Sequence, residues 1–426
     1  MGITVKGEII VTARENYYTT IDERYTNPDG LRRVRHISKA WESDFTNRQT
    51  VQYSDDNGAT WGPEEDSYGD VYSTAPDGSW EIMNCNCAAD VYNPAHRHFV
   101  GMGMQRIFKN GRKAAYEAFW RRSEREWSDH CFLFVRGENE PDAAASLIKF
   151  EQGPEFNPDN PLAPGYFNTN QAYFSVPWVM KNGDVCFAIG PLVSDCCRIL
   201  GVDTQNVFPS NPGIFYGMIA GRGVWNGNNY DISFSRPVVL SDLLSSRGID
   251  EPIVAELTSG RLLVAHRGSN TRSENWKTRI EPGAPGFKWY TYSDDGGKTF
   301  APSAPWHFDD GEVIYSSATF SRFIRPLKNG KLYWVGNITG HKVDGNYPRW
   351  PLQIVEVDER YGTAKKDSLT VIDTRRDGEP DTVQLSNFDL MEDRATGDLE
   401  VRLTKIGQYG AKEPWRADTW KYTVTV

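Results

Sequence analysis

The sequence predicts an all-β fold, a six-bladed β-propeller built from four-stranded antiparallel blades. The first observation is a repeated pattern in which an apolar run, a short glycine turn and a second apolar run follow one another, as in an antiparallel hairpin. The second is that no segment has a long 3.6-residue apolar period, so helices are expected to be few and short. The third is length, because 426 residues divided by six gives 71 residues for each blade, enough for four strands.

The hairpin pattern marks the expected inner strands of the blades. Clear copies occupy residues 177–187, 253–264 and 323–335, weaker copies occupy 88–104 and 387–403, and half a copy occupies 7–14. The last strand, residues 420–426, is expected to pair with the N-terminal blade, because a propeller has to protect its open sheet edges. The whole chain, 1–426, is therefore expected to form a single domain.

Two segments, 53–61 and 292–300, share the pattern Ser-x-Asp-x-Gly-x-Thr-aromatic. In each, the third residue of the pattern, Asp56 or Asp295, is expected to accept backbone N–H bonds across a tight turn that the glycine permits. The aromatic residue that ends each segment is expected to pack between neighbouring sheets. The pattern resembles the Asp-box of the sialidase-like superfamily, and this resemblance implies Asp-box turns on the outer strands of the propeller.

Composition and charge exclude several classes of protein. The formal net charge of −10 argues against a nucleic-acid partner, because binding phosphates needs clustered cations. No run of about 18 apolar residues exists, so no membrane span is expected. Residues 1–6 lack the apolar core of a signal peptide, and we expect a cytoplasmic protein, or a secreted or periplasmic one whose signal has been removed. The six cysteines lack zinc-ribbon spacing and are expected to be buried thiols, with no metal and no cofactor.

The fourth blade carries the strongest resemblance to a sialidase site. Glu251 precedes the expected inner strand of this blade, and Arg267 follows sixteen residues later at the end of its second strand, beside His266. In the sialidase-like family a glutamate at this place activates the nucleophile, and the arginine binds an anionic sugar. The resemblance therefore implies a catalytic role for Glu251 and substrate binding by Arg267 and His266.

The fifth blade and the rim add further substrate-binding candidates. Arg322 and Arg325 are similar to a family segment that carries another substrate arginine, and only one of them can face the channel, because residues three apart on a strand point to opposite faces. Asn337 ends the second strand of this blade, and Arg349 follows it toward the rim. Arg14 lies where the family often has an auxiliary arginine.

Two departures from the family identify the chain as a divergent member. It has no Phe/Tyr-Arg-Ile-Pro segment, and residues 384–387, where the family has its nucleophilic tyrosine, contain no tyrosine. Paired carboxylates can hydrolyse a glycosidic bond instead, one as general acid and the other as base or nucleophile. Glu251 with Asp22 or Asp44 is the expected catalytic pair.

The expected function is that of a glycoside hydrolase acting on an acidic or decorated oligo- or polysaccharide at the central mouth of the propeller. A first alternative is a polysaccharide lyase, in which Tyr173 or a histidine removes a proton from a uronate whose carboxylate is neutralised by arginine. A second is a non-catalytic glycan-binding propeller, since aromatic side chains stack on sugars in both enzymes and binding proteins. The groups at the central mouth would distinguish the three functions. Two facing carboxylates would indicate a hydrolase, a Tyr/His pair beside arginines a lyase, and neither arrangement a binding protein.

Overall fold

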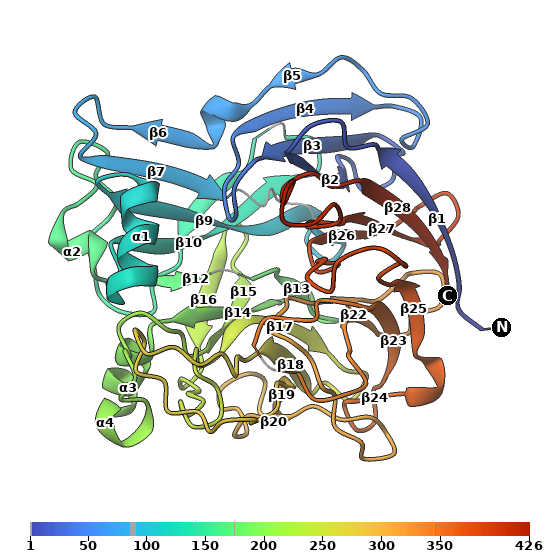
Figure 1. Cartoon of the computed structure of the whole chain (residues 1–426). Helices are drawn as coiled ribbons and strands as arrows, with labels where there is room; N and C mark the ends of the chain where they lie inside the picture. Colours follow the sequence, from blue (N-terminus) through green and yellow to red (C-terminus); the bar gives the residue numbers. More distant parts are fainter. Residues whose placement is uncertain (1, 86–90, 141, 174, 344) are drawn as a thin grey trace. The chain divides into compact units, whose positions relative to one another are not determined.

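The computed structural model describes residues 2–85, 91–140, 142–173, 175–343 and 345–426. Over these residues the protein is an all-β, six-bladed β-propeller of small antiparallel sheets, which confirms the predicted fold class (Figure 1). Three sheets have four strands, two have five and one has six, because short extra strands extend the four-stranded pattern. The chain divides into two compact units, the first made of Met1–Tyr68, Pro285–Lys288 and Pro305–Val426, the second of Gly69–Ala284 and Trp289–Ala304.

The first unit contains the first and the last two sheets of the chain. One sheet has the order β2-β3-β4-β5, with bounds Tyr18–Tyr25, Arg33–Ala40, Arg48–Ser54 and Glu65–Asp66. The next has the order β21-β22-β23-β24, with β25 on β23; the bounds are Arg322–Ile324, Tyr333–Asn337, Leu352–Asp358, Thr363–Ala364 and Thr370–Asp373. The last has the order β26-β27-β28-β1, with bounds Phe388–Glu392, Leu399–Thr404, Thr419–Thr425 and Thr4–Val11.

The second unit contains the other three sheets, apart from Lys288 and Pro305 at the edges of β19 and β20. Its first sheet has β6 (Tyr72–Thr74), β7 (Trp80–Cys85), β8 (Val91–Asn93), β9 (His98–Lys109), β10 (Trp127–Gly137) and β11 (Ala144–Leu147). The second has β12 (Ala172–Tyr173), β13 (Trp178–Val179), β14 (Val185–Pro191), β15 (Ile219–Trp225) and β16 (Tyr230–Phe234). The third has β17 (Asp250–Glu256), β18 (Leu262–Arg267), β19 (Lys288–Ser293) and β20 (Ala304–Pro305).

Helices are few and short, as the sequence predicts. In the described part of the chain the α-helices are α1 (Arg112–Arg122), α2 (Pro164–Phe167), α3 (Val193–Leu200) and α4 (Thr204–Val207). Two 3-10 turns, η1 (Tyr68–Asp70) and η2 (Lys366–Ser368), complete the list. No helix in the described residues is long and apolar enough to cross a membrane.

The N-terminal strand completes the last sheet, not the first. β1 pairs antiparallel with β28, from Thr4 opposite Thr425 to Val11 opposite Thr419 (Figure 1). The expected pairing of the last strand with the N-terminal segment is therefore confirmed, but residues 7–14 are not the inner half-hairpin of a first blade, because β1 is the outer strand of the last sheet. β1 is an outer edge strand, and its apolar pair Ile9 and Ile10 is exposed to solvent. An apolar run alone does not distinguish an inner strand from such an edge.

The other predicted hairpins lie where the pattern put them. Residues 253–264 become β17 and β18, 323–335 become β21 and β22, and 387–403 become β26 and β27. Residues 177–187 form β13 and the start of β14, and β12 adds a second short segment along β14. In the weak copy at 88–104, residues 88–90 lie outside the described residues, and the remainder forms β8 and part of β9.

Apolar side chains fill the space between adjacent sheets within each unit. In the first unit Val335 and Ile354 belong to one buried cluster with Leu399 and Val401, which joins the β21–β25 sheet to the β26–β28 sheet. In the second unit Val100, Leu133 and Phe187 belong to another such cluster. Because these layers fix the sheets against each other, the first strand of every sheet has a defined position from which polar side chains can project.

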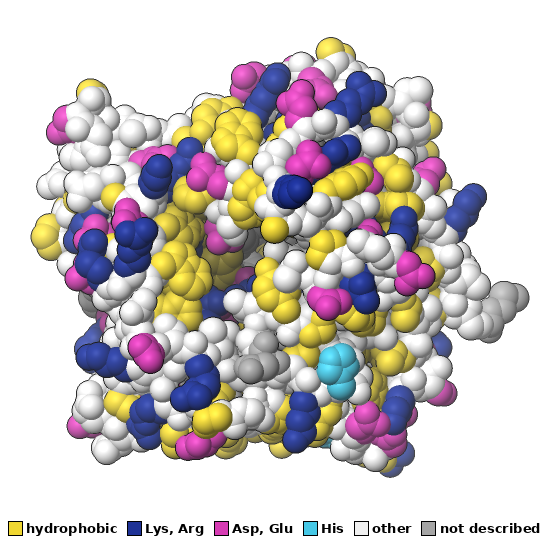
Figure 2. All heavy atoms as spheres, viewed as in Figure 1, with side chains coloured by type: hydrophobic (Ala, Val, Ile, Leu, Met, Phe, Trp, Pro, Cys, Tyr) yellow, Lys and Arg dark blue, Asp and Glu magenta, His cyan; other side chains and the backbone are white. Residues whose placement is uncertain are grey.

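The visible surface carries charges of both signs. Figure 2 shows Lys and Arg side chains interspersed with Asp and Glu side chains, and hydrophobic side chains in small groups between them. The face seen in this view therefore has no single basic field of the kind that binds nucleic acid.

The two repeated turn segments adopt the same hydrogen-bonded conformation. Asp56, between β4 and β5, accepts bonds from Ser54 Oγ (2.8 Å), Thr60 N (2.8 Å) and Thr60 Oγ1 (2.5 Å). Asp295, between β19 and β20, accepts the corresponding bonds from Ser293 and Thr299 at 2.8, 3.0 and 2.6 Å. The Thr60 hydroxyl is the largest cause that lowers the pKa of Asp56 to about 2, since each donor favours the carboxylate.

The aromatic residue that ends the first turn is placed differently from the expectation. Trp61 is half-buried, and the Arg35 guanidinium lies 4.1 Å from its ring centroid. Arg35 belongs to β3 of the same sheet, so this contact is made within one blade. A tight turn at the sheet edge brings its last residue back over its own strands, and cation–π attraction to Arg35 stabilises that position.

We expect Asp56→Asn to lower the melting temperature, because a single amide oxygen cannot accept the bonds that both carboxylate oxygens accept here. The depressed pKa of Asp56 makes its contribution present above the unfolded-state pKa of about 3.9 and lost as pH falls through about 2. Thermal unfolding followed by circular dichroism should therefore separate variant and parent at pH 7 and bring them together near pH 2.

The matched control for this prediction is Asp55→Asn. Asp55 is the neighbouring residue, its side chain is 86% exposed, and it makes a surface ion pair with Arg32 at 3.2 Å. An equal loss of melting temperature in both variants would contradict the role given to Asp56.

Candidate functional site

In the first unit, the first strands of the three sheets lie side by side. β2 contacts β26, and β21 contacts β26, so three edge strands that are far apart in sequence form one surface. They carry Asp22 on β2, Asp389 on β26 and Arg322 on β21. The strand period of two puts Asp22 and Arg24 on one face of β2 and Glu23 on the other. The three strands therefore bring charged side chains together.

Asp22 has an unusual carboxyl group. The residue is exposed by surface area, yet enough protein surrounds the carboxyl group for burial to be the largest cause that raises its pKa. The neighbouring Asp389 raises it further, whereas Arg322, Arg24 and Arg402 lower it, and the resulting pKa is about 6. A carboxylic acid with such a pKa can hold a proton in mildly acidic solution and give it up at neutral pH.

Asp389 is held by donors from two strands. Glu23 N donates to Asp389 Oδ2 at 3.0 Å, and Arg402 Nη1 donates to the same oxygen at 3.1 Å. The backbone bond comes from the residue next to Asp22 in the chain. The two carboxyl groups are therefore positioned relative to each other by the backbone of β2.

Arg24 is oriented by a histidine that is directly opposite Asp22 in the strand register. Arg24 Nη2 contacts His36 Nε2 at 2.6 Å, and Asp22 pairs with His36 across β2 and β3. Burial, followed by the Arg24 charge, lowers the pKa of His36 to about 4. At neutral pH the ring is therefore uncharged, and its Nε2 accepts the bond from Arg24.

The structure separates the roles of Arg322, at the start of β21, and Arg325, just after its end. Arg325 binds the Glu359 carboxylate with both Nη atoms, at 2.6 and 2.7 Å. Arg322 makes no ion pair with a carboxylate in the described part of the chain, and its charge acts on Asp22. Arg322 is thus the one of the two that faces the carboxylate pair.

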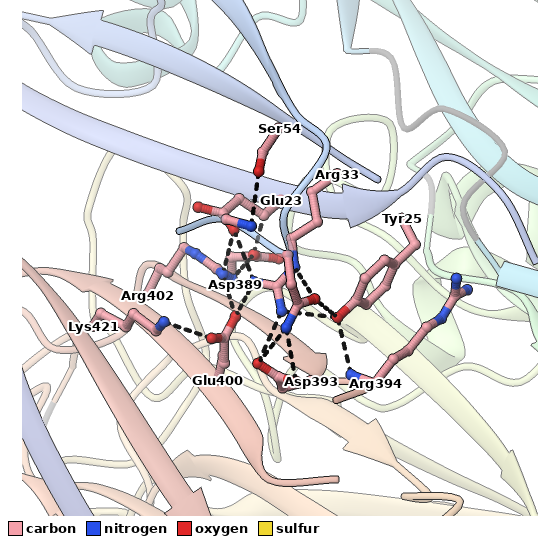
Figure 3. Close-up of polar contacts among 12 residues, drawn as sticks. Glu23, Tyr25, Arg33, Ser54, Asp389, Asp393, Arg394, Glu400, Arg402 and Lys421 are labelled. Carbon is pink, nitrogen blue, oxygen red and sulfur yellow. Dashed lines mark hydrogen bonds and ion pairs between the residues drawn. The ribbon is translucent and has the colours of Figure 1, made fainter. Parts of the chain in front are cut away.

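Asp389 contacts a buried ionic network through Arg402 (Figure 3). The side chains of Arg33 and Arg402 are each only 1% exposed. Arg33 Nη1 lies 2.7 Å from Glu400 Oε2, and Arg402 Nη2 lies 2.5 Å from both Glu400 Oε2 and Glu23 Oε2. Arg33 and Glu23 belong to the first sheet and the other two to the last sheet, so the network joins these two sheets.

The same network reaches the turn that contains Asp56. Arg33 Nη2 donates to Tyr25 Oη at 2.8 Å, and Tyr25 Oη donates to Asn57 Oδ1 at 2.6 Å. Asn57 Nδ2 lies 3.1 Å from Asp393, which is in the turn between β26 and β27. Arg33 Nη2 contacts the same carboxylate at 3.0 Å (Figure 3). The turns of the two sheets are thereby fastened to each other.

In the second unit, Glu251 and Arg267 are neighbours, as the sixteen-residue separation predicts. Arg267 Nη1 donates to Glu251 Oε2 at 2.9 Å, and Nη2 lies 3.2 Å from Asp250 Oδ2. Burial alone would lower the pKa of Arg267, but Asp250 and Glu251 raise it overall. A register shift between Asp250 and Ile253 places Glu251 at φ 47°. The two predicted residues therefore satisfy each other as an ion pair.

Tyr173 lies near this pair. Burial is the largest cause that raises the pKa of Tyr173, and the Glu251 charge raises it further, while Arg106 lowers it. The Arg106 guanidinium is 6.0 Å from the Tyr173 ring centroid and binds the fully buried Asp129 with two bonds, at 2.5 and 3.0 Å. A raised pKa keeps Tyr173 protonated, which is the wrong state for a base.

The remaining sequence candidates have other surroundings. His266 is buried against Ser303 (2.9 Å), and Asn337 Nδ2 donates to three backbone carbonyls, including Leu385 O at 3.2 Å. Arg349 Nη1 donates to Gln384 Oε1 at 2.8 Å. The last two candidates are exposed in loops. Asp44 lies between β3 and β4, and Arg14 lies between β1 and β2.

Asp389, Arg402, Arg24 and His36 were not identified from the sequence. Their signal was weak, because each is a charged or polar residue at an alternate position of an otherwise ordinary strand. Within the described residues there is no cluster of His, Cys, Asp and Glu that could hold a metal ion. Cys85, Cys131, Cys186, Cys196 and Cys197 are free thiols, and Cys87 lies outside the described residues.

Comparisons with known proteins concern the fold. No protein-family model matches the sequence, and no curated protein is significantly similar to it. A solved protein of unknown function from Dyadobacter fermentans matches over 100% of this chain and 99% of its own, with 13% identity and a TM-score of 0.57. A mutant of NanB sialidase from Streptococcus pneumoniae matches over 98% of this chain and 70% of its own, with 10% identity and a TM-score of 0.50.

Trypanosoma rangeli sialidase in complex with sialic acid matches over 98% of this chain but only 58% of its own, with 13% identity and a TM-score of 0.49. The chain thus spans little more than half of that protein. The match to NanB sialidase shows that the two chains share a fold.

We expect Arg33→Met to destabilise the protein by up to about 3–5 kcal/mol, because it removes the buried cation that Glu400 and Asp393 share and leaves their negative charges less well balanced. Urea unfolding measures the effect. The control is Arg32→Met at the adjacent position, where the side chain is 51% exposed and pairs with Asp55 on the surface, a contact worth less than about 1 kcal/mol. Equal losses in the two variants would show that the network does not stabilise the fold.

Proposed function

We propose that the protein is a glycoside hydrolase that acts on an acidic or decorated glycan, with Asp22 as general acid and Asp389 as the second carboxylate. The observation that carries this proposal is the pair itself: two carboxyl groups on neighbouring first strands, one with its pKa raised to about 6 and one held by Glu23 N and Arg402. Carboxyl groups placed in different environments are what glycosidic bond cleavage needs.

In the proposed reaction the Asp22 carboxyl group gives its proton to the glycosidic oxygen as the bond from that oxygen to the anomeric carbon breaks. Asp389 either attacks the anomeric carbon or takes a proton from the water that does so. Water supplies the new hydroxyl group in both cases, and a proton returns to the carboxylate pair. No other reactant is required.

Arg322 is the proposed binding group for an anionic substituent. Its guanidinium lies close enough to Asp22 to lower the pKa of that carboxyl group, and no carboxylate of the described residues pairs with it. A carboxylate or sulfate on the sugar fits the planar donor fork of arginine. This charge would bind the substrate next to the proposed general acid.

The first alternative, a lyase with Tyr173 as base, receives less support. Abstraction of a proton by tyrosine requires the tyrosinate, but burial and Glu251 raise the pKa of Tyr173. A purely glycan-binding role would not need a carboxyl pair with a raised pKa. The sialidase-like fold, shared with NanB sialidase, supports a hydrolase only by analogy.

We also propose that residues 1–426 act as one propeller domain and that the turns at Asp56 and Asp295 are Asp-boxes.

We expect Asp22→Asn to lower kcat at least about 100-fold with little change in KM, because general acid catalysis typically contributes that much or more. A panel of acidic polysaccharides and chromogenic uronides, assayed for reducing ends and for the ultraviolet absorbance of unsaturated uronates, identifies the substrate and distinguishes hydrolysis from elimination. For the parent protein kcat/KM should fall as pH rises through about 6, because the acid then loses its proton.

The control variant is Asp44→Asn. Asp44 is an exposed aspartate in the loop between β3 and β4 of the same sheet, and it was the other candidate acid. Loss of activity in Asp44→Asn with full activity in Asp22→Asn would refute the assignment, and so would unsaturated products.

Arg322→Lys should raise KM for the anionic substrate about tenfold or more, because lysine cannot form the bidentate contact. Arg325→Lys is the matched control, since Arg325, just after the opposite end of the same strand, already binds Glu359. Steady-state kinetics on the substrate and on its neutral analogue give the comparison. The proposal fails for this residue if the neutral analogue loses as much as the anionic one.

A further inference from the structure

Each sheet of the first unit carries one exposed aromatic ring on the loop between its second and third strands. These rings are Trp41 (51% exposed), Tyr347 (40%) and Tyr409 (39%). The loops follow β3, β22 and β27. Because neighbouring strands are antiparallel, these loops lie at the end of each sheet where its first strand begins. This is the end at which Arg322 and Asp389 occur, as the first residue of β21 and the second residue of β26.

The loops that carry the two tyrosines are tied together by backbone hydrogen bonds. Leu385 N donates to Arg349 O at 2.9 Å, and Gln384 N donates to Ile406 O at 2.8 Å. The segment between them runs directly into β26, with Gln384 five residues before Asp389. The tyrosine loops therefore form a rigid rim next to the strand that carries the second carboxylate.

Both tyrosine rings are supported by an arginine of their own loop. The Arg416 guanidinium lies 4.3 Å from the Tyr409 ring centroid, and that of Arg349 lies 5.8 Å from the Tyr347 ring centroid. Tyr409 Oη also donates to Asp418 Oδ2 at 3.2 Å. One face of each ring is thus associated with a cation, and the exposed part of the ring is held in a fixed position.

The chemistry around these rings favours a sugar chain over a protein or a membrane. A protein or membrane partner requires a contiguous apolar area, whereas these rings are single and stand among arginine, glutamine and aspartate side chains. A pyranose stacks its C–H face on one aromatic ring and bonds its hydroxyl groups to polar groups around it.

We propose that Tyr347 and Tyr409 are stacking subsites for sugar units beyond the two that the cleaved bond joins, so that the substrate is a polysaccharide and not a terminal sugar alone. This inference rests on the proposed function, because it takes the carboxylate pair as the place of cleavage. It predicts that binding of a polymer depends on the rim and that cleavage of a small substrate does not.

The test uses the full chain with Asp22→Asn, which keeps a polymer intact, and affinity gel electrophoresis in polygalacturonate, chondroitin sulfate, alginate and dextran. Tyr347→Ala and Tyr409→Ala should each weaken retardation by at least one of these polymers about fivefold, and the double variant should weaken it further. The matched control is Tyr361→Ala, an exposed tyrosine with the Arg360 guanidinium 5.0 Å from its ring, in the turn between β23 and β24 at the other end of one of these sheets.

In the protein with Asp22 intact, the double variant should keep kcat/KM for a chromogenic monosaccharide uronide within about twofold of the parent. The inference is overturned if no polymer is retarded or if the rim variants behave like Tyr361→Ala. It is also overturned if sedimentation shows that the parent is a dimer and the double variant a monomer, because loss of the dimer would then explain the weaker retardation. In a different outcome, polymer binding depends on the tyrosines while activity does not depend on Asp22. That result would support the stacking subsites and refute the assignment of Asp22 as the general acid.

Discussion

The buried contacts of Arg33 and Arg402 are the interaction on which the arrangement of the first unit depends. Both guanidinium groups are removed from water, and they share Glu400, with Glu23 and Asp393 around them. Desolvation of such charges is expensive, and only the full set of partners offsets it. The sheets of β2 and β27 are therefore held in one relative position, because a shift of either would leave a charge without its partner.

The same guanidinium groups connect the framework to the candidate chemistry. Arg402 contacts Glu400 and Glu23 with Nη2 and Asp389 with Nη1, while its charge also acts on Asp22. Asp22 and Glu23 are consecutive residues that point to opposite faces of β2. One strand thus presents a structural carboxylate on one face and a proposed catalytic one on the other. Placing the site on strands and not on loops gives its carboxyl groups fixed positions.

The sequence was sufficient for features that are local in the chain and insufficient for those that depend on distant strands. Hairpin patterns and the two repeated turns identified the fold class, and Glu251 and Arg267 were found because sixteen residues of one hairpin separate them. Asp389 could not be paired with Asp22, since their proximity depends on which blades adjoin and in what register. Whether Glu251 and Arg267 pair with each other or with a ligand also depends on side-chain geometry, which spacing does not specify.

The pairing of β1 with β28 means that the last sheet can be completed only late in synthesis and folding. Thr4 lies opposite Thr425, so β1 finds its partner only after all the residues between these two strands have been synthesised. Contacts between such distant segments raise the contact order and slow folding. Until they form, β28 presents an unpaired edge that invites association with other chains. The final closure of this sheet is therefore the step at which newly made chains would be most prone to aggregate.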